Sequence, residues 1–132
     1  MSFDIYLQAF ENGAAVERDG SVIRDLLLAH ADEQASGRDF AHVSYGDGAA
    51  DVYGVPADGE PCAGLMFNHV EGTAFDLILE VARRSDFVVM PIGCPVCVVS
   101  ERQVEHLPPE LRNTAVEVVR TGRELADVIA RN

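Results

Sequence analysis

The segment Cys94-Pro95-Val96-Cys97 has the most chemically specific spacing in the chain. A pair of cysteines separated by two residues exchanges thiols and disulfides when a helix N-terminus lowers the pKa of the first thiol. Val98 and Val99 follow the pair directly, which predicts a strand–turn–strand rather than the start of a helix. We therefore expect both cysteines to be buried as small apolar residues, with a thiol-redox site as the alternative.

The same pair could contribute two ligands to a zinc site. Structural zinc needs four ligands, which usually come from two closely spaced pairs. The chain contains no second C-x-x-C and no H-x-x-x-H, so the other ligands would have to be isolated residues. Those residues are Cys62, His42, His69 and His106. We predict neither a bound metal nor a cofactor, and keep the metal site as an alternative.

Three polar residues, Asn68, His69 and Glu71, interrupt an apolar segment just before a predicted helix. Polar groups at a strand end beside a helix N-terminus can bind an anion or position a catalytic base. Structural roles are also open to them, because His69 can bond to the backbone and Glu71 can favour the positive end of the helix. The chain has no G-x-S-x-G, no phosphate loop, no dinucleotide fingerprint and no H-E-x-x-H. A small-molecule enzyme or ligand binder at these residues is therefore an alternative, and we favour a protein that is not an enzyme.

Tyr6, Tyr45 and Tyr53 fall on or near predicted strands, with acidic residues such as Asp51 around them. If those strands are neighbours, the rings form an exposed aromatic patch with a charged rim, which is typical of a protein interface. The alternative is that the rings cap the core while their hydroxyls reach water. These four residues form the candidate interface.

The chain carries 22 acidic and 10 basic residues, which gives a formal net charge of −12. A surface of this sign repels nucleic acids and anionic membranes, so we expect neither as a partner. It attracts a basic protein, although acidity also serves solubility alone. The leading hypothesis is a non-catalytic protein-binding module with an acidic surface for a basic protein partner. A homodimer is also open.

Hydrophobic periodicity divides the chain into strands and helices. Residues Phe3 to Phe10 alternate with period two, which predicts a strand, and a helix with one apolar face is expected from Ser21 to a stop at Gly37. A three-strand meander with a tight turn at Gly46-Asp47-Gly48 follows, and Thr73 opens a second helix. The remaining predicted elements are strands over 87–92, 96–99 and 115–120, a short helix ended by Pro108, and a last helix capped by Thr121.

The main order of these elements, β-α-β-β-β-α-β-β-α, predicts an α+β fold in a single domain over residues 1–132. The hairpin signals predict a mostly antiparallel sheet with helices mainly on one face. The N-terminus lacks the basic and apolar segments of a signal peptide, and no apolar run is long enough to span a bilayer. We therefore expect a cytoplasmic protein.

The opening segment Met1-Ser2-Phe3-Asp4-Ile5-Tyr6-Leu7, with the size and acidity of the chain, resembles small acidic bacterial proteins. Some of these are similar to immunity proteins, which bind and neutralise a toxin produced by their own cell. The resemblance implies binding of a protein partner without catalysis. It assigns no functional residue.

Overall fold

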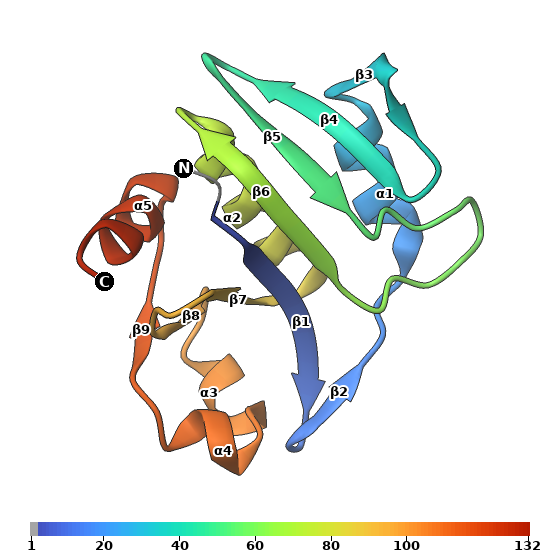
Figure 1. Ribbon diagram of the computed structural model, residues 1–132. Helices are drawn as coiled ribbons and strands as arrows, with labels where there is room; N and C mark the ends of the chain where they lie inside the picture. Colours follow the sequence, from blue (N-terminus) through green and yellow to red (C-terminus); the bar gives the residue numbers. More distant parts are fainter. Residues whose placement is uncertain (1–2) are drawn as a thin grey trace.

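The computed structural model describes residues 3–132, which form nine strands and five helices. The helices pack against an open sheet (Figure 1). Met1 and Ser2 of the opening segment lie outside the described residues. The strands are β1 (Ile5–Glu11), β2 (Ala14–Val16), β3 (Ala31–Gly37), β4 (Phe40–Tyr45), β5 (Gly48–Tyr53), β6 (Leu65–Glu71), β7 (Val88–Pro91), β8 (Val96–Val98) and β9 (Val116–Val118). The helices are α1 (Gly20–Leu28), α2 (Ala74–Ser85), α3 (Arg102–His106), α4 (Pro109–Arg112) and α5 (Gly122–Ala130). None of these helices is long and apolar enough to cross a membrane.

The strands form one sheet in the order β3-β4-β5-β6-β1-β7-β8-β9, and β2 pairs with β1 outside this path. Neighbouring strands pair antiparallel along the path, except for β8 and β9, which are parallel. The predicted α+β fold with a mostly antiparallel sheet is therefore confirmed. Strand β1 inserts between β6 and β7, which brings the N-terminal segment to the middle of the sheet.

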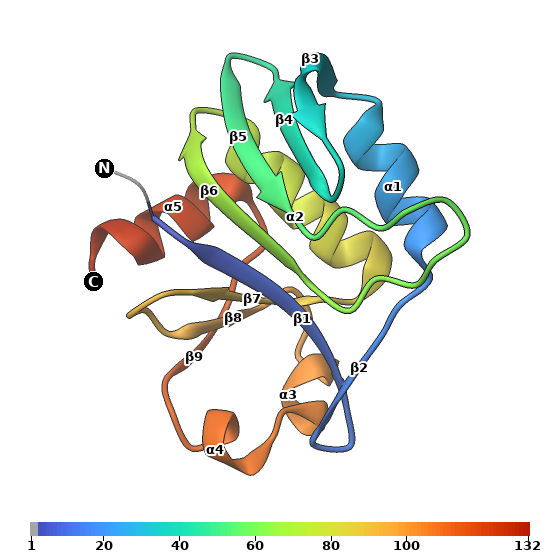
Figure 2. The same ribbon diagram turned by 45° about the vertical axis from the view of Figure 1, so that its right-hand side comes forward.

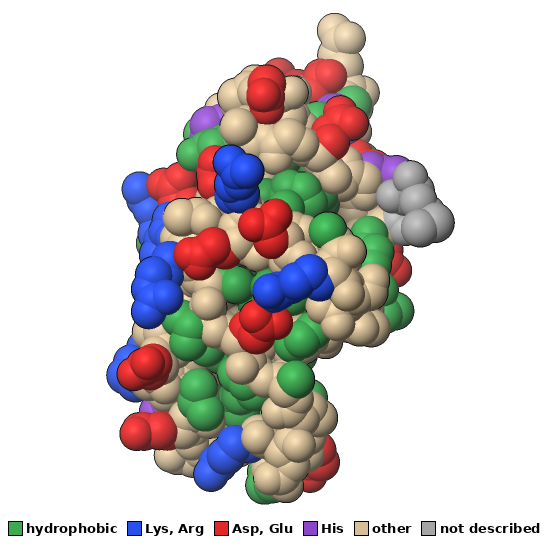
Figure 3. Space-filling model, turned by 90° about the vertical axis from the view of Figure 1, so that its left-hand side faces the viewer, with side chains coloured by type: hydrophobic (Ala, Val, Ile, Leu, Met, Phe, Trp, Pro, Cys, Tyr) green, Lys and Arg blue, Asp and Glu red, His purple; other side chains and the backbone are tan. Residues whose placement is uncertain are grey.

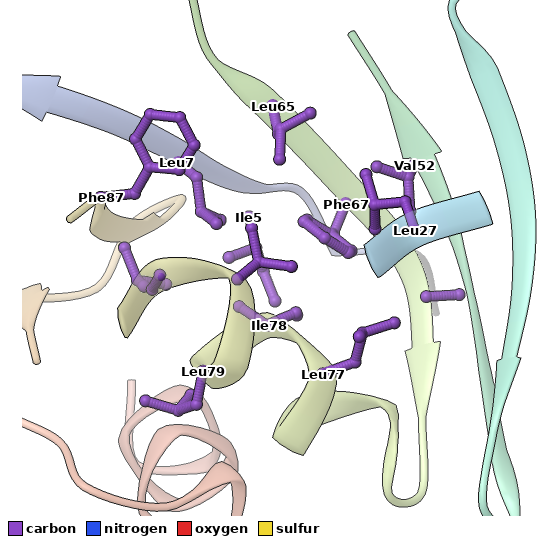
Figure 4. Packing of buried hydrophobic residues seen from close by; sticks show 14 of the residues in the cluster. Ile5, Leu7, Leu27, Val52, Leu65, Phe67, Leu77, Ile78, Leu79 and Phe87 are labelled. Carbon is purple, nitrogen blue, oxygen red and sulfur yellow. The ribbon is translucent and has the colours of Figure 1, made fainter. Parts of the chain in front are cut away.

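The main core lies between the sheet and helices α1, α2 and α5 (Figures 1 and 2). Ile5 and Leu7, which alternate along β1, point into it, as does Phe67 of β6. Figure 4 shows these side chains facing Leu77 and Ile78 of α2. Each such burial stabilises the fold by about 1.5–3 kcal/mol relative to an exposed side chain.

A smaller apolar cluster lies on the other face of the sheet, at its β7–β9 end. Cys97 belongs to the main core, and its neighbour Val98 belongs to the smaller cluster, so the two clusters occupy opposite faces of β8. Leu107, between α3 and α4, is fully buried in the smaller cluster. Helices thus lie mainly on one face, as predicted. Helix α3 packs against the outer face of β1 only at the Phe10 end, in the smaller cluster. Within residues 3–132, no helix covers the outer face of β4, β5, β6 and the first half of β1, and we call this surface the uncovered face (Figures 1 and 2).

The predicted boundaries of the first helix are wrong at both ends. Asp19 is the N-cap, because its side chain accepts a hydrogen bond from the backbone N–H of Ser21, which lies inside the helix. The helix ends at Leu28, and the residues from Ala31 to Gly37 form the edge strand β3. Residues 32–36 offer no large apolar side chain for a helix to bury, whereas the ends of this segment, at Ala31, Asp32 and Gly37, pair with β4.

The hairpin between β4 and β5 has Gly46 and Asp47 as its two central residues, because Tyr45 pairs with Gly48. The predicted turn is in the right place, but only Gly46 takes a positive φ, of +58°. Gly48 is needed for a different reason. A Cβ at this position would collide with the carbonyl oxygen of Glu71. The start of β5 therefore lies directly against the end of β6.

Candidate functional site

Cys94 and Cys97 lie where β7 turns into β8, in the strand–turn–strand that the sequence predicts. Cys97 is fully buried in the main core, and Cys94 is partly buried against it. Burial raises the pKa of the Cys94 thiol. Burial and the nearby Glu117 carboxylate raise the pKa of Cys97 to about 12. Both thiols are therefore protonated at neutral pH, whereas redox exchange needs an activated thiolate.

The residues that would have to complete a zinc site have other surroundings. Cys62 is buried in the core, where burial raises the pKa of its thiol. His106 accepts a hydrogen bond at Nδ1 from the backbone N–H of Asn12, at 3.1 Å. His42 and His69 belong to the outer face of the sheet. Among residues 3–132, no group of three or more His, Cys, Asp or Glu side chains is arranged to hold a metal ion.

A β-bulge divides the candidate polar residues near the end of β6. Asp51 pairs with Asn68 and Ala49 pairs with Glu71, so β6 has one residue more than β5 between the two pairs. His69 takes up this extra length with a φ of +51°, in the left-handed region. Its side chain bonds to Asp51 on β5, whereas Glu71 is exposed at the strand end. The structure thus brings His69 and Asn68 next to Asp51 and leaves Glu71 apart.

Asp51 lies between two histidines, a group that we call the His42–Asp51–His69 cluster. The His42 Nδ1 is 2.7 Å from Oδ1 of Asp51, and the His69 Nδ1 is 2.9 Å from Oδ2. Burial alone would raise the pKa of Asp51, but the hydrogen bonds and charges of the two histidines outweigh burial and lower it. Asp51 is therefore ionised at neutral pH. Because a carboxylate only accepts hydrogen bonds, both Nδ1 atoms carry the hydrogen.

Sequence reasoning did not pair His42 with Asp51, although the hairpin contains the signal. A two-residue turn at Gly46 and Asp47 sets His42 opposite Asp51. A turn shifted one residue later, with Asp47 and Gly48 at its centre, would set His42 opposite Tyr53 instead. The identity of the turn residues therefore decides whether the cluster forms.

Tyr45 is not part of the aromatic patch that the sequence predicts. It has the same alternation along β4 as the buried Val43, so its ring lies on the face that the helices cover. Its hydroxyl donates to Glu80 of α2 at 3.3 Å. Burial, followed by the charge of Glu80, raises the pKa of Tyr45. The ring is a core-capping residue, which is the alternative that the sequence left open.

Tyr6 and Tyr53 lie on the uncovered face, in a row of five side chains from adjacent strands. The register pairs Phe40 with Tyr53, Tyr53 with Met66, Met66 with Tyr6, and Tyr6 with Met90. We call these five residues the apolar row. Tyr6 is 44% exposed and Tyr53 is 41% exposed. The rings of Phe40 and Tyr53 pack at a centroid distance of 4.9 Å.

A groove of about 420 Å³ follows the apolar row. Two glycines, Gly54 and Gly64, line it together with four members of the row. A Cβ on Gly54 would lie 2.7 Å from the carbonyl oxygen of Gly64, so the two chain segments approach too closely for a side chain there. The described lining contains no Asp, Glu, His, Cys, Lys or Arg. The groove therefore offers mainly apolar contact, with the hydroxyls of Tyr6 and Tyr53 as the ionisable groups of its described lining.

A second row of side chains runs beside the apolar row, two residues further along each strand. Asp32 pairs with His42, His42 with Asp51, and Asp51 with Asn68. Asp4 directly precedes β1, two residues before Tyr6, and we place it next to Asn68 by extending the register of β1 with β6 by one residue. We call these five residues the polar row. The two rows are about 7 Å apart, because each residue of a strand advances by about 3.4 Å.

The central strands of the uncovered face carry no positive side chain to balance its carboxylates, and Arg24 and Arg38 line a pocket with Phe40 at the edge of the sheet. All ten arginines lie outside β4, β5, β6, β1 and β7, and the chain has no lysine. Figure 3 shows the side that carries α5 and β9, where arginine and carboxylate side chains are mixed. Four arginines form ion pairs with carboxylates away from the uncovered face: Arg18, Arg84, Arg102 and Arg131. The polar row, in contrast, contains three aspartates, one histidine and Asn68, and the second histidine of the cluster, His69, lies beside it.

Comparisons with protein-family models, with curated proteins and with solved structures find no match. What the site can do chemically is therefore argued from the positions of its own residues. An imidazole held by a carboxylate, as in the His42–Asp51–His69 cluster, is one part of a general base. The cluster lies beside the groove rather than in it, however, and does not line the space where a substrate would sit. The arrangement is suited to contact with another molecule.

Proposed function

We propose that this protein is a non-catalytic protein-binding module whose uncovered sheet face binds a basic protein partner. The apolar row carries the proposal, because it forms a continuous grooved surface that runs across the uncovered face to Met90, at the border of the smaller cluster. Half-exposed aromatic and Met side chains gathered on one surface are typical of binding sites. Tyrosines are also among the residues that contribute most to affinity at interfaces.

The charge of the face supports a basic partner. Asp4, Asp32 and Asp51 adjoin the apolar row, and no Lys or Arg lies on the central strands. Opposite charge accelerates the encounter of two proteins and orients them. A second copy of this chain fits less well, because two faces of the same sign would meet and each chain carries a net charge of −12. Nucleic acid is disfavoured by the same repulsion.

The proposal includes an immunity-like role in the cytoplasm, in which the partner is a toxin that complex formation neutralises. The acidity and small size of the chain support this role. A mainly apolar groove without Asp, Glu, His, Cys, Lys or Arg in its described lining agrees with binding of a partner.

A binding measurement with matched variants tests the proposal. The probe is a fluorescent peptide in which Arg and Leu alternate, and fluorescence anisotropy reports its affinity at physiological ionic strength. The face variant is Tyr6→Thr/Tyr53→Thr, because Thr keeps a preference for strands while removing the rings. The control variant is Val22→Gln/Leu28→Gln on α1, whose side chains are 42% and 43% exposed, like those of the two tyrosines.

We expect the wild type and the control variant to bind the peptide, and the face variant to bind at least about thirtyfold more weakly. Interface hot spots cost about 2 kcal/mol or more when truncated, which corresponds to about thirtyfold. A peptide with Glu in place of Arg is expected not to bind. Equal binding by the face and control variants would mean that charge alone attracts the peptide, which would contradict the proposal. Absence of binding to the wild type would contradict it as well, as would a wild-type dimer that the face variant abolishes.

A further inference from the structure

The His42–Asp51–His69 cluster lies inside the face proposed to bind the partner, one row away from the groove. We infer that this cluster makes binding of the basic partner pH-dependent, by reversing the charge at the centre of the polar row. The inference rests on the proposed function, and names how the same site is regulated.

Each histidine ring of the cluster has one nitrogen, Nε2, that does not contact Asp51. Both Nδ1 atoms donate to Asp51, so an added proton enters each ring at Nε2. Neither His42 nor His69 forms a hydrogen bond at Nε2 with another side chain of the described residues. Each ring can therefore take one proton from water without breaking its contact with Asp51. The net charge of the cluster then changes from −1, with both rings neutral, to +1.

The groups around the cluster do not compensate for this change. Asp32 adjoins it on β3, Asp4 lies just before β1, and Glu71 stands at the end of β6. Carboxyl groups titrate well below histidine, which changes charge between about pH 5 and pH 8. No Lys or Arg lies on the strands of this face, and no described helix covers it. Among the residues of the polar row and the cluster, His42 and His69 are the ones whose residue type changes charge in this range.

The two rings are also accessible to a partner. The His69 side chain is 61% exposed and the His42 side chain is 37% exposed, whereas Asp51 between them is 20% exposed. The left-handed backbone of His69 at the bulge directs its ring across to β5. A basic partner that covers the apolar row thus meets a negative cluster at neutral pH and a positive one at acidic pH. A unit charge at contact distance in water changes affinity by about fivefold, so two charges change it by at least about tenfold.

The test measures binding of the Arg–Leu peptide at about pH 7.5 and about pH 5.5, the range in which histidine changes charge. The cluster variant is His42→Gln/His69→Gln, because Gln is neutral and keeps an N–H to donate to Asp51. The control variant is His30→Gln/His106→Gln, which removes the two histidines outside the His42–Asp51–His69 cluster. Circular dichroism at both pH values verifies folding, and the single variants replace any double variant that does not fold.

We expect the wild type and the control variant to lose at least about tenfold in affinity at the lower pH, and the cluster variant to lose less than about twofold. Asp51→Asn is expected to weaken binding already at the higher pH, because it removes the negative charge of the cluster. Wild-type binding that does not change with pH would overturn the inference and leave the proposed function intact. The same would follow if the cluster variant kept the full pH dependence. No binding by the wild type at the higher pH would overturn both.

Discussion

Cys97 offers a quantitative test of the conclusion that the cysteine pair is packed rather than reactive. With a pKa of about 12, about one thiol in 10,000 is ionised at about pH 8. An ordinary thiol with a pKa of about 8.5 is about one-quarter ionised at that pH. Once ionised, the Cys97 thiolate is intrinsically a better nucleophile than the ordinary thiolate, by about fortyfold for this difference in pKa. The smaller ionised fraction and the greater nucleophilicity together make Cys97 react with a disulfide reagent about sixtyfold more slowly than an ordinary thiol. Burial of the sulfur slows the reaction further.

The assay uses Cys62→Ala/Cys94→Ala, in which Cys97 is the remaining thiol, with an aromatic disulfide reagent that releases a coloured thiolate. We expect native Cys97 to react at least about sixtyfold more slowly than the same variant unfolded in urea. The matched variant Cys62→Ala/Cys97→Ala retains Cys94, which is only partly buried and is expected to react faster than Cys97. The reasoning would be refuted if native Cys97 reacted within a few-fold of the unfolded rate. A Cys94–Cys97 disulfide formed by oxidised glutathione in the wild type would refute it too.

Two further predictions concern stability. Gly48→Ala is expected to destabilise the fold by about 1–3 kcal/mol in urea unfolding, because the new Cβ meets the backbone of Glu71. The control variant Gly37→Ala places its Cβ in open space and is expected to change stability by less than about 1 kcal/mol. Equal effects of the two substitutions would contradict the close approach of β5 to β6. Asp51 has a lower pKa in the folded protein than in the unfolded chain, so its contribution to stability is present above about pH 4 and is lost as the pH falls through its folded value. The urea midpoint of the wild type should therefore fall more steeply with acidification than that of Asp51→Asn, and parallel curves would contradict the hydrogen bonds to the two histidines.

Much of the fold follows from local patterns in the sequence. Alternation of apolar residues identifies β1, and glycine-containing turns identify the hairpin of β4 and β5. The valines that follow Cys97 correctly indicate a strand rather than a redox-active helix N-terminus. These features depend on neighbours within a few residues, which is why single-sequence reasoning finds them.

The candidate site depends on pairings between distant segments, which local patterns do not contain. Tyr6 meets Met66 and Met90 because β1 inserts between β6 and β7. The alternation of β1 predicts which of its side chains share a face, but not which strands lie beside it. The bulge that turns His69 toward Asp51 is equally hidden, because it depends on the relative lengths of β5 and β6 between their paired residues.

The claim that the uncovered sheet face is the binding surface is tested most directly by nuclear magnetic resonance. Isotope-labelled protein is titrated with the Arg–Leu peptide, and shifts of the backbone amide signals locate the contact. We predict that the largest shifts fall on the apolar row, which consists of Phe40, Tyr53, Met66, Tyr6 and Met90. Signals of α1, including those of Val22 and Leu28, are expected to stay in place. Shifts concentrated on the helices, with the five strands of the row unchanged, would contradict the account.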